Sequence, residues 1–228
     1  VVNEVIKKFP EAEMIYLSDN KNLPYGDKTV EFIKVRLKEM LNYLYSKGCH
    51  VVFIACHSAS SVYVKHQELF RYDGMKIVDT IQPTCSYLNT FPRTSVGIMA
   101  TDRTIEDKTY SNNLTGHDVL NFPSGNLAKM IEMRHSSDPD IDEDQDYSIT
   151  ASFLKNILEE SKLKLLSKIV LACTHYPHVI DSIREWVGLH SEECEVIDPA
   201  NIVVSGFSID DLIGDTEDTE DFENSYTY

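Results

Sequence analysis

Two apolar runs along the chain end in the same dipeptide. Residues 51–55 end in Ala55, which Cys56 follows, and residues 168–172 end in Ala172, which Cys173 follows. A continuous apolar run of this length is typical of a strand buried in a parallel sheet. Ligands of open α/β sheets bind at the carboxyl ends of the strands. Both cysteines are therefore predicted to lie at a binding edge.

The same pattern predicts further elements on either side of these two strands. Apolar residues at helical spacing predict a helix over 29–47, and Gly48 ends it. The other predicted helices cover about 58–70, 149–166 and 178–187, with a short one after Pro83. The other predicted strands are 14–17, 76–78, 94–100 and 195–198. Strands that alternate with helices indicate βαβ units and a parallel sheet.

The repeated Ala-Cys turn indicates an α/β protein of two pseudo-symmetric parallel-sheet domains, with the site in the cleft between them. We expect a first domain over 1–92, completed by about 199–228, and a second over 93–198. The alternative is one doubly wound domain with both cysteines in its core, where free cysteine is common. The chain opens inside a helical pattern, so we expect the first strand of the first sheet to be missing.

Charge and cysteine content limit which partners, metal sites and cellular compartment the sequence is compatible with. A net charge of −16 over 228 residues argues against nucleic acid and anionic membranes as partners. The acidic runs at 136–146 and 210–224 are interpreted as a solvated loop and a tail. Five cysteines without a CxxC pair argue against disulfides and a zinc cluster, and favour a cytoplasmic protein. No apolar stretch approaches the roughly 20 residues of a membrane span.

Two cysteines in equivalent places suggest a specific chemistry. A cysteine at a helix start is close to backbone amides that stabilise a thiolate. One such cysteine with a histidine base would suit a thiol hydrolase. Two would let one thiolate remove a proton from a carbon centre while the opposite thiol returns one to the other face. That exchange inverts stereochemistry.

Hydroxyl and imidazole groups stand beside both cysteines. His57 follows Cys56 directly, and His175 lies two residues after Cys173, where it can tune the thiol or relay a proton. Hydroxyls near predicted strand ends suit a substrate carboxylate, although each one equally suits a helix cap: Ser58, Ser60, Thr101, Thr104 and Thr174.

Four segments resemble motifs of the glutamate racemases in the cofactor-independent Asp/Glu racemase superfamily. The second catalytic motif of that family, Cys-Thr-His-Tyr-Pro, is matched without departure by Cys173–Pro177. The other similar segments are 18–28 (the Gly-Asp…Pro-Tyr-Gly-x-Lys loop), 55–60 (the first catalytic motif) and 97–104 (the central Ala-Thr-x-x-Thr strand end).

The resemblance implies an enzyme that interconverts L- and D-glutamate and supplies D-glutamate for peptidoglycan. It implies that Cys56 and Cys173 exchange protons with the substrate, assisted by His175. It also implies a homodimer, no pyridoxal phosphate or other cofactor, and no metal. Glu132 falls near a glutamate that the family keeps close to its second cysteine. The expected substrate-binding residues are Tyr25, Gly26, His57, Ser58, Thr101, Thr104, Thr174 and His175.

Two departures from the family keep other functions open. The family opens with a strand ending in Asp-Ser-Gly that this sequence does not contain, and His57 stands where the family has Asn. The histidine either weakens amino-acid binding or pairs as a cation with the Cys56 thiolate. One alternative is therefore a degenerate homologue that binds an acidic amino acid or a protein without turnover. The other is a racemase of aspartate or hydantoin type.

Overall fold

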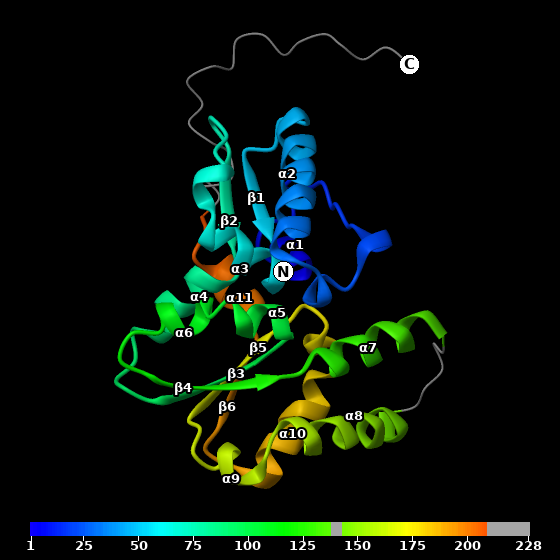
Figure 1. Cartoon of the computed structure of the whole chain (residues 1–228), viewed down its shortest axis with the longest axis vertical. Helices are drawn as coiled ribbons and strands as arrows, with labels where there is room; N and C mark the ends of the chain where they lie inside the picture. Colours follow the sequence, from blue (N-terminus) through cyan, green and yellow to red (C-terminus); the bar gives the residue numbers. More distant parts are fainter. Residues whose placement is uncertain (138–142, 209–228) are drawn as a thin grey trace.

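The computed structural model describes residues 1–137 and 143–208, and its strands form two parallel sheets. The smaller sheet pairs β1 with β2, and the larger has the order β4-β3-β5-β6. In Figure 1 the smaller sheet occupies the upper half of the molecule and the larger sheet the lower half. The strands are β1 (Val51–Ile54), β2 (Lys76–Asp79), β3 (Ser95–Ala100), β4 (Asp118–Pro123), β5 (Lys168–Ala172) and β6 (Glu195–Ile197).

Helices connect these strands, as the βαβ prediction requires. The α-helices are α1 (Val2–Lys8), α2 (Val30–Ser46), α3 (His57–Lys65), α4 (Ile81–Leu88), α5 (Asp102–Glu106), α6 (Thr109–Asn113), α7 (Gly125–Ser137), α8 (Glu143–Ile157), α9 (Glu160–Leu163), α10 (Ile180–His190) and α11 (Pro199–Ser205). Short 3₁₀ turns are η1 (Asn20–Asn22), η2 (Tyr25–Asp27), η3 (Gln67–Leu69) and η4 (Tyr176–Val179).

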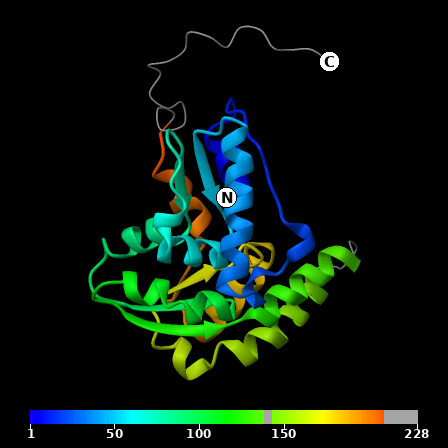
Figure 2. The same ribbon diagram turned by 45° about the horizontal axis from the view of Figure 1, so that its top comes forward.

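Helix α2 illustrates how the sequence pattern becomes structure. The Thr29 side chain caps its start by accepting a hydrogen bond from the backbone N–H of Phe32. Four apolar residues at helical spacing lie buried along one side: Ile33, Leu37, Leu41 and Leu44. Each buried aliphatic side chain contributes about 1.5–3 kcal/mol of transfer free energy. These contacts hold α2 against the smaller sheet, and the helix lies beside that sheet in Figure 2.

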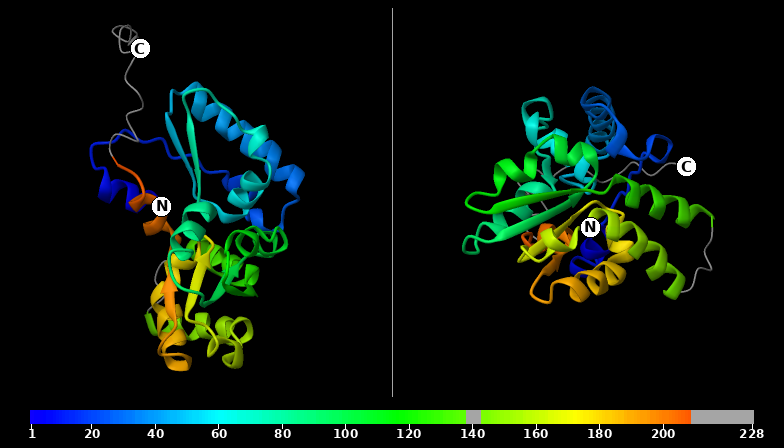
Figure 3. Two further views of the ribbon diagram at one scale, coloured as in Figure 1. Left: turned by 90° about the vertical axis from the view of Figure 1, so that its left-hand side faces the viewer. Right: turned by 60° about the horizontal axis from the view of Figure 1, so that its bottom comes forward.

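The larger sheet is buried on both faces, which explains the continuous apolar runs. Met99 and Leu171 lie in a core with α7, α8 and α10, whereas Ile98 and Val170 lie in a core with α4 and α6. Successive side chains of a strand point to opposite faces, so both faces need apolar residues. The two sheets stay in separate halves of the molecule in the turned views of Figure 3.

Register brings the second cysteine beside the central strand end. Ala100 at the end of β3 pairs with Ala172 at the end of β5. Thr101 and Cys173 are the next residues of each strand, so both leave the sheet at the same edge. Cys56 stands two residues after Ile54, the last residue of β1. The predicted placement of both cysteines just beyond strand ends is confirmed.

Some predicted elements differ from the structure. The strand expected over 14–17 is wrong: this segment joins neither sheet, and Met14, Ile15 and Tyr16 are exposed. The helix expected over 58–70 divides into α3 and η3, and that over 149–166 into α8 and α9. Strand β4 and helices α5, α6, α7 and α11 had no prediction.

The domain limits stay a prediction, although the end of the described chain returns to its beginning. Val204 of helix α11 packs with Val5, which lies in α1, and with Phe9, which directly follows α1. The ring of Phe207 lies 5.1 Å from that of Phe53 in β1. The acidic run at 136–146 lies partly outside the described residues, and the run at 210–224 lies wholly outside them.

Candidate active site

Three buried hydroxyls join the two halves of the molecule near the strand ends. The Oγ of Ser58, at the start of α3, lies 2.9 Å from Thr101 Oγ1 and 3.4 Å from Thr104 Oγ1. The two threonine hydroxyls are 3.3 Å apart. Ser58 follows the smaller sheet, whereas both threonines follow the larger one. The cluster therefore brings together three of the predicted binding residues.

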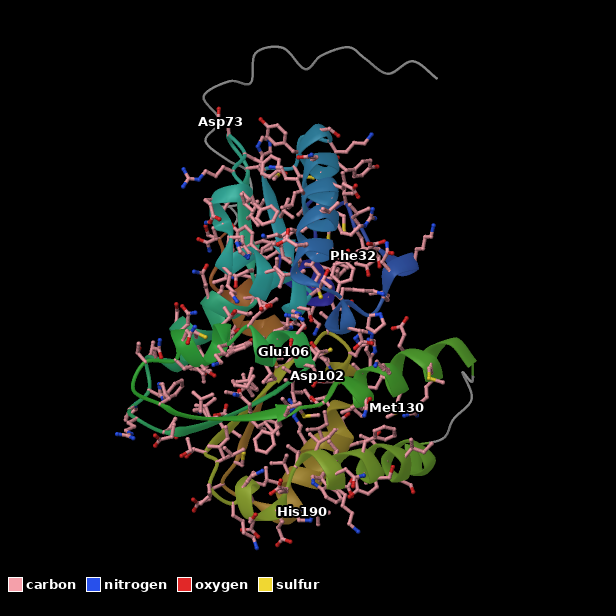
Figure 4. All side chains as sticks on the ribbon, in the orientation of Figure 1. Phe32, Asp73, Asp102, Glu106, Met130 and His190 are labelled. Carbon is pink, nitrogen blue, oxygen red and sulfur yellow. The ribbon has the colours of Figure 1, made fainter. Side chains whose placement is uncertain are left out.

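Gly26 packs against the same cluster. A Cβ added there would lie 2.7 Å from the Cβ of Thr101, too close for any side chain. An ion pair between Asp27 and Lys129 (2.8 Å) links the same turn to α7. In Figure 4, Asp102 lies between the two halves, while Asp73 and His190 mark opposite ends. The predicted loop residue Gly26 is thus held at the junction.

Cys56 stands at the amino end of α3, where helix geometry favours a thiolate. Its side chain is half-buried. Burial raises the pKa of the Cys56 thiol, and the backbone amides of Ala59 and Ser58 oppose that effect. Because the pKa of the thiol is raised, only a small fraction of Cys56 is a thiolate near pH 7, but that thiolate is a strong base.

Cys173 is buried more deeply than Cys56. Burial raises the pKa of the Cys173 thiol to about 12, against the backbone amides of His175 and Tyr176. A negative charge on Cys56 raises the pKa of Cys173 as well. Because like charges disfavour each other, the pair is best suited to one thiolate and one thiol at a time.

His175 connects Cys173 to an acidic side chain. Its Nδ1 lies 3.5 Å from the Cys173 sulfur, and its Nε2 lies 2.7 Å from Oε2 of Glu132. A carboxylate can only accept, so Nε2 carries a proton, and a ring with that single proton leaves Nδ1 as an acceptor. Glu132 thereby orients the ring that receives the Cys173 S–H.

Tyr25 is buried, and its hydroxyl is used within the protein. It donates to Asp19 at 2.7 Å, and Asp19 also accepts from Arg36 Nε at 2.8 Å. The Arg36 bond is the main reason that the pKa of Asp19 falls to about 2. Burial and the Asp19 carboxylate raise the pKa of Tyr25. This network fixes the loop that carries Gly26.

His57 is buried without a hydrogen-bond partner on either ring nitrogen among the described residues. Its ring stacks on that of Tyr110 with centroids 6.2 Å apart. Burial lowers the pKa of His57 to about 3. The ring is therefore neutral near pH 7, which argues against an ion pair with the Cys56 thiolate.

The structure joins three predicted hydroxyls and Gly26 in one cluster and joins Cys173 to His175, whereas Ser60 and Thr174 lie outside the cluster. The Ser60 hydroxyl donates to the carbonyl oxygen of Ile54. Thr174 is exposed and is not part of the hydroxyl cluster. Glu132 matched the family only loosely in sequence, yet it contacts His175 directly. Arg36 had no sequence signal, because only the folded loop places Asp19 beside it. No group of three or more metal-ligating side chains occurs within 1–137 and 143–208.

Two parallel sheets with cysteines at their strand ends place the chain among α/β proteins whose sites form at that edge. The pattern of one family, described as Asp/Glu/Hydantoin racemase, matches residues 1–206. The chain belongs to the Asp/Glu/Hydantoin racemase family, and the predicted cofactor-independent racemase class is confirmed. Within the described residues, no helix is long and apolar enough to cross a membrane.

Known relatives agree with this assignment. The chain is 28% identical over 206 residues to glutamate racemase 3 of Caldanaerobacter subterraneus subsp. tengcongensis, covering 88% of this chain and 69% of the relative. A glutamate racemase structure from Bacillus anthracis superposes with a TM-score of 0.77 at 22% identity, covering 90% and 74%. One from Francisella tularensis, in complex with D-glutamate, gives 0.73 at 23%, covering 90% and 73%. The predicted two-sheet α/β fold is confirmed.

Proposed function

We propose that this protein interconverts L- and D-glutamate, with Cys56 and Cys173 as the two acid–base groups. The hydroxyl cluster that joins the two cysteine-bearing strand ends is the observation that carries the proposal: Ser58, two residues after Cys56, lies 2.9 Å from Oγ1 of Thr101, which leaves the larger sheet beside Cys173. The two cysteines are 117 positions apart in the chain, and each stands just beyond a parallel strand. Two cysteines that merely filled the core would have no reason to occupy equivalent strand ends in both sheets.

The proposed proton transfer is balanced without a further reactant. A thiolate removes the Cα proton from one face of glutamate and becomes a thiol. The electron pair left on Cα delocalises into the substrate carboxylate, and the opposite S–H returns a proton to the other face. Each turnover therefore inverts the substrate and exchanges the protonation states of the two cysteines. The reverse reaction uses the same groups in opposite roles.

Burial supports the proposed acid and base roles of the two cysteines. A buried thiolate is a stronger base than an exposed one, which suits a weakly acidic C–H bond. His175 accepts the S–H of Cys173 through Nδ1 and keeps that proton near the sulfur. Hydroxyls of Ser58, Thr101 and Thr104 are the proposed donors to the carboxylate, where negative charge develops.

Glutamate is the proposed substrate because the relatives reported above carry that name and one was solved with D-glutamate. The intact Cys173–Pro177 segment and the Tyr25–Gly26 loop agree with that choice. The neutral, unpartnered ring of His57 favours a second candidate: a homologue that binds an acidic amino acid without turnover. Binding of glutamate measured by calorimetry, with no change in its optical activity, would identify this second function.

Activity can be tested by following the circular dichroism of L-glutamate and, separately, of D-glutamate. We expect both to approach the same racemic mixture, and Cys56→Ser and Cys173→Ser each to abolish this change. Cys194→Ser is the matched control, because Cys194 is a buried thiol beside β6 and away from the hydroxyl cluster. No change with either enantiomer would refute the proposal. Full activity in either site variant would refute the two-thiol assignment.

We further propose that the D-glutamate is used for peptidoglycan in the cytoplasm and that the protein acts as a homodimer. Growth of a bacterium that requires external D-glutamate, restored by this chain but not by its Cys173→Ser variant, tests the role. Light scattering of the purified protein tests the dimer. A monomeric mass at micromolar concentration would contradict it.

A further inference from the structure

A buried carboxylate joins the two halves of the molecule one helical turn beyond the hydroxyl cluster. Asp107 directly follows α5, and its side chain is only 3% exposed. Its Oδ2 accepts a hydrogen bond from Ser61 Oγ at 2.7 Å, and its Oδ1 lies 3.3 Å from Nζ of Lys65. Both partners belong to α3, which follows the smaller sheet, whereas α5 follows the larger one. In Figure 4, Asp102 and Glu106 mark the two ends of α5 between the halves.

Asp107 and the hydroxyl cluster join the same faces of the same two segments. Ser58 and Ser61 are one helical turn apart in α3, so both side chains lie on one face of that helix. Thr104 and Asp107 are one turn apart as well, in α5 and directly after it. Ser58 contacts Thr104, and one turn farther along Ser61 contacts Asp107. A shift of α3 against α5 therefore breaks both contacts together.

Arg103 extends this network to the loop that carries Gly26. Its Nη1 lies 3.7 Å from Oδ1 of Asp107, and its Nε donates to the carbonyl oxygen of Lys28 at 3.3 Å. Lys28 directly follows η2, the turn that contains Gly26. Three segments that carry proposed substrate-binding residues thus meet around one carboxylate: the start of α3, the start of α5 and η2.

A carboxylate buried to this degree needs its partners. Removing a charge from water is costly unless opposite charges and hydrogen-bond donors replace the water. Ser61 and Lys65 supply these groups from α3, and Arg103 supplies another from α5. The charge is fully compensated only while the two helices keep this register. Apolar contacts alone have no such direction, so the carboxylate selects one relative position of α3 and α5.

We propose that Asp107 is a positioning residue for substrate binding. It fixes α3 against α5 and thereby keeps the Ser58 hydroxyl and the two threonine hydroxyls directed at one substrate carboxylate. This inference rests on the proposed function, in which those three hydroxyls bind that carboxylate. It goes beyond the proposed function by naming the group that sets their spacing across the two halves.

The test measures the affinity of the whole protein for D-glutamate by isothermal titration calorimetry. Asp107→Asn keeps the shape of the side chain and removes its charge. We expect Kd to rise about tenfold, the effect of one charge-assisted hydrogen bond, and KM to rise in parallel. Glu106→Gln is the matched control, because it removes a neighbouring carboxylate that is 61% exposed and pairs with Arg103 at 3.0 Å. An exposed ion pair contributes little, so Kd should be unchanged.

A double-mutant cycle separates positioning from a general loss of packing. Ser58→Ala removes the hydroxyl through which Asp107 is proposed to act. Adding Asp107→Asn to that variant should therefore raise Kd by less than about threefold further. A further rise of about tenfold, with the two effects additive, would overturn the proposal.

A second variant keeps the proposal testable if Asp107→Asn folds poorly. Ser61→Ala removes the other partner of the 2.7 Å bond with a residue that favours helix. Its Kd should rise about threefold, the effect of one ordinary hydrogen bond, and this rise should also disappear in the presence of Ser58→Ala. An unchanged Kd in both Asp107→Asn and Ser61→Ala would overturn the proposal.

Failure of the proposed function appears in the parent protein instead of the variants. A parent that binds D-glutamate without racemising it loses the proposed reaction, and its Kd still tests Asp107. A parent that does not bind glutamate at all would overturn both.

Discussion

Replacing Glu132 with Gln tests whether His175 accepts the S–H of Cys173 through Nδ1. A glutamate only accepts from Nε2 of His175, whereas the amide of glutamine can also donate to it. In the variant the proton can move to Nδ1, which then points a donor at Cys173 instead of an acceptor. The size of the side chain is kept, so the change is one of tautomer and charge.

The expected fall in kcat follows from how far the His175 and Glu132 side chains are exposed to solvent. The bond is 2.7 Å long, with side chains 18% exposed for His175 and 44% exposed for Glu132. A hydrogen bond to a charged group contributes about 1.5–3 kcal/mol when buried, and an exposed ion pair about 0.2–1 kcal/mol. An intermediate value of about 1–2 kcal/mol corresponds to a fall in kcat of about 5- to 30-fold.

The assay is steady-state racemisation followed by circular dichroism in both directions. We expect kcat to fall and KM to change by less than about twofold, because Glu132 acts through His175 rather than on the substrate. Glu160→Gln is the matched control: it removes an exposed carboxylate paired with Lys164, in α9, and should leave kcat unchanged. A Glu132→Gln enzyme with the kcat of the parent protein would refute the assigned tautomer.

Three further predictions concern the residues that surround the site. Gly26→Ala should destabilise the protein by about 1–3 kcal/mol in urea unfolding and raise KM, because its Cβ would meet Thr101 at 2.7 Å; unchanged stability and KM would contradict the packing. The pKa of His57 is lowered to about 3, so the unfolded chain binds more protons below about pH 6.5, and stability should fall between there and pH 3. His57→Asn should flatten that part of the unfolding free energy against pH, and an identical slope would exclude a buried neutral ring. Asp19→Asn should lower stability above pH 4 and by less at pH 2, because the Arg36 bond depresses the pKa of Asp19 to about 2 and about half of the carboxyl is protonated there; an equal loss at both pH values would contradict the ion pair.

The sequence predicted the central strands well because burial on both faces leaves a continuous apolar run. Strands β3 and β5, in the middle of the larger sheet, have that pattern. Strand β1 also has an apolar run, although its burial alternates along the strand. Strand β4 lies at the edge of the larger sheet, and its sequence DVLNFP mixes polar and apolar residues, so no run marked it. The segment 14–17 has apolar residues of the right kind but no neighbouring strand to pair with. Pairing is a tertiary property that a local pattern does not contain.

The residues of the candidate site were likewise predictable where their signal is local and not where only packing places them. Cys56 and Cys173 were predictable because strand ends and helix starts are local features of the chain. Glu132 was indicated only by the loose family resemblance, because it lies on α7, 43 residues before His175, and only packing brings the two side chains together. The burial of His57 was also invisible in sequence, since it depends on Tyr110 of α6 covering the ring.

The central claim is that Cys56 and Cys173 act from opposite faces of one carbon. It is tested most directly by running the reaction in deuterated water from pure L-glutamate and separating the enantiomers early. The account predicts deuterium at Cα of the new D-glutamate, while the remaining L-glutamate keeps its original hydrogen, because each face has its own thiol. The same labelling should appear in reverse from D-glutamate. Equal deuterium in both enantiomers at early times would indicate a single base and contradict the account.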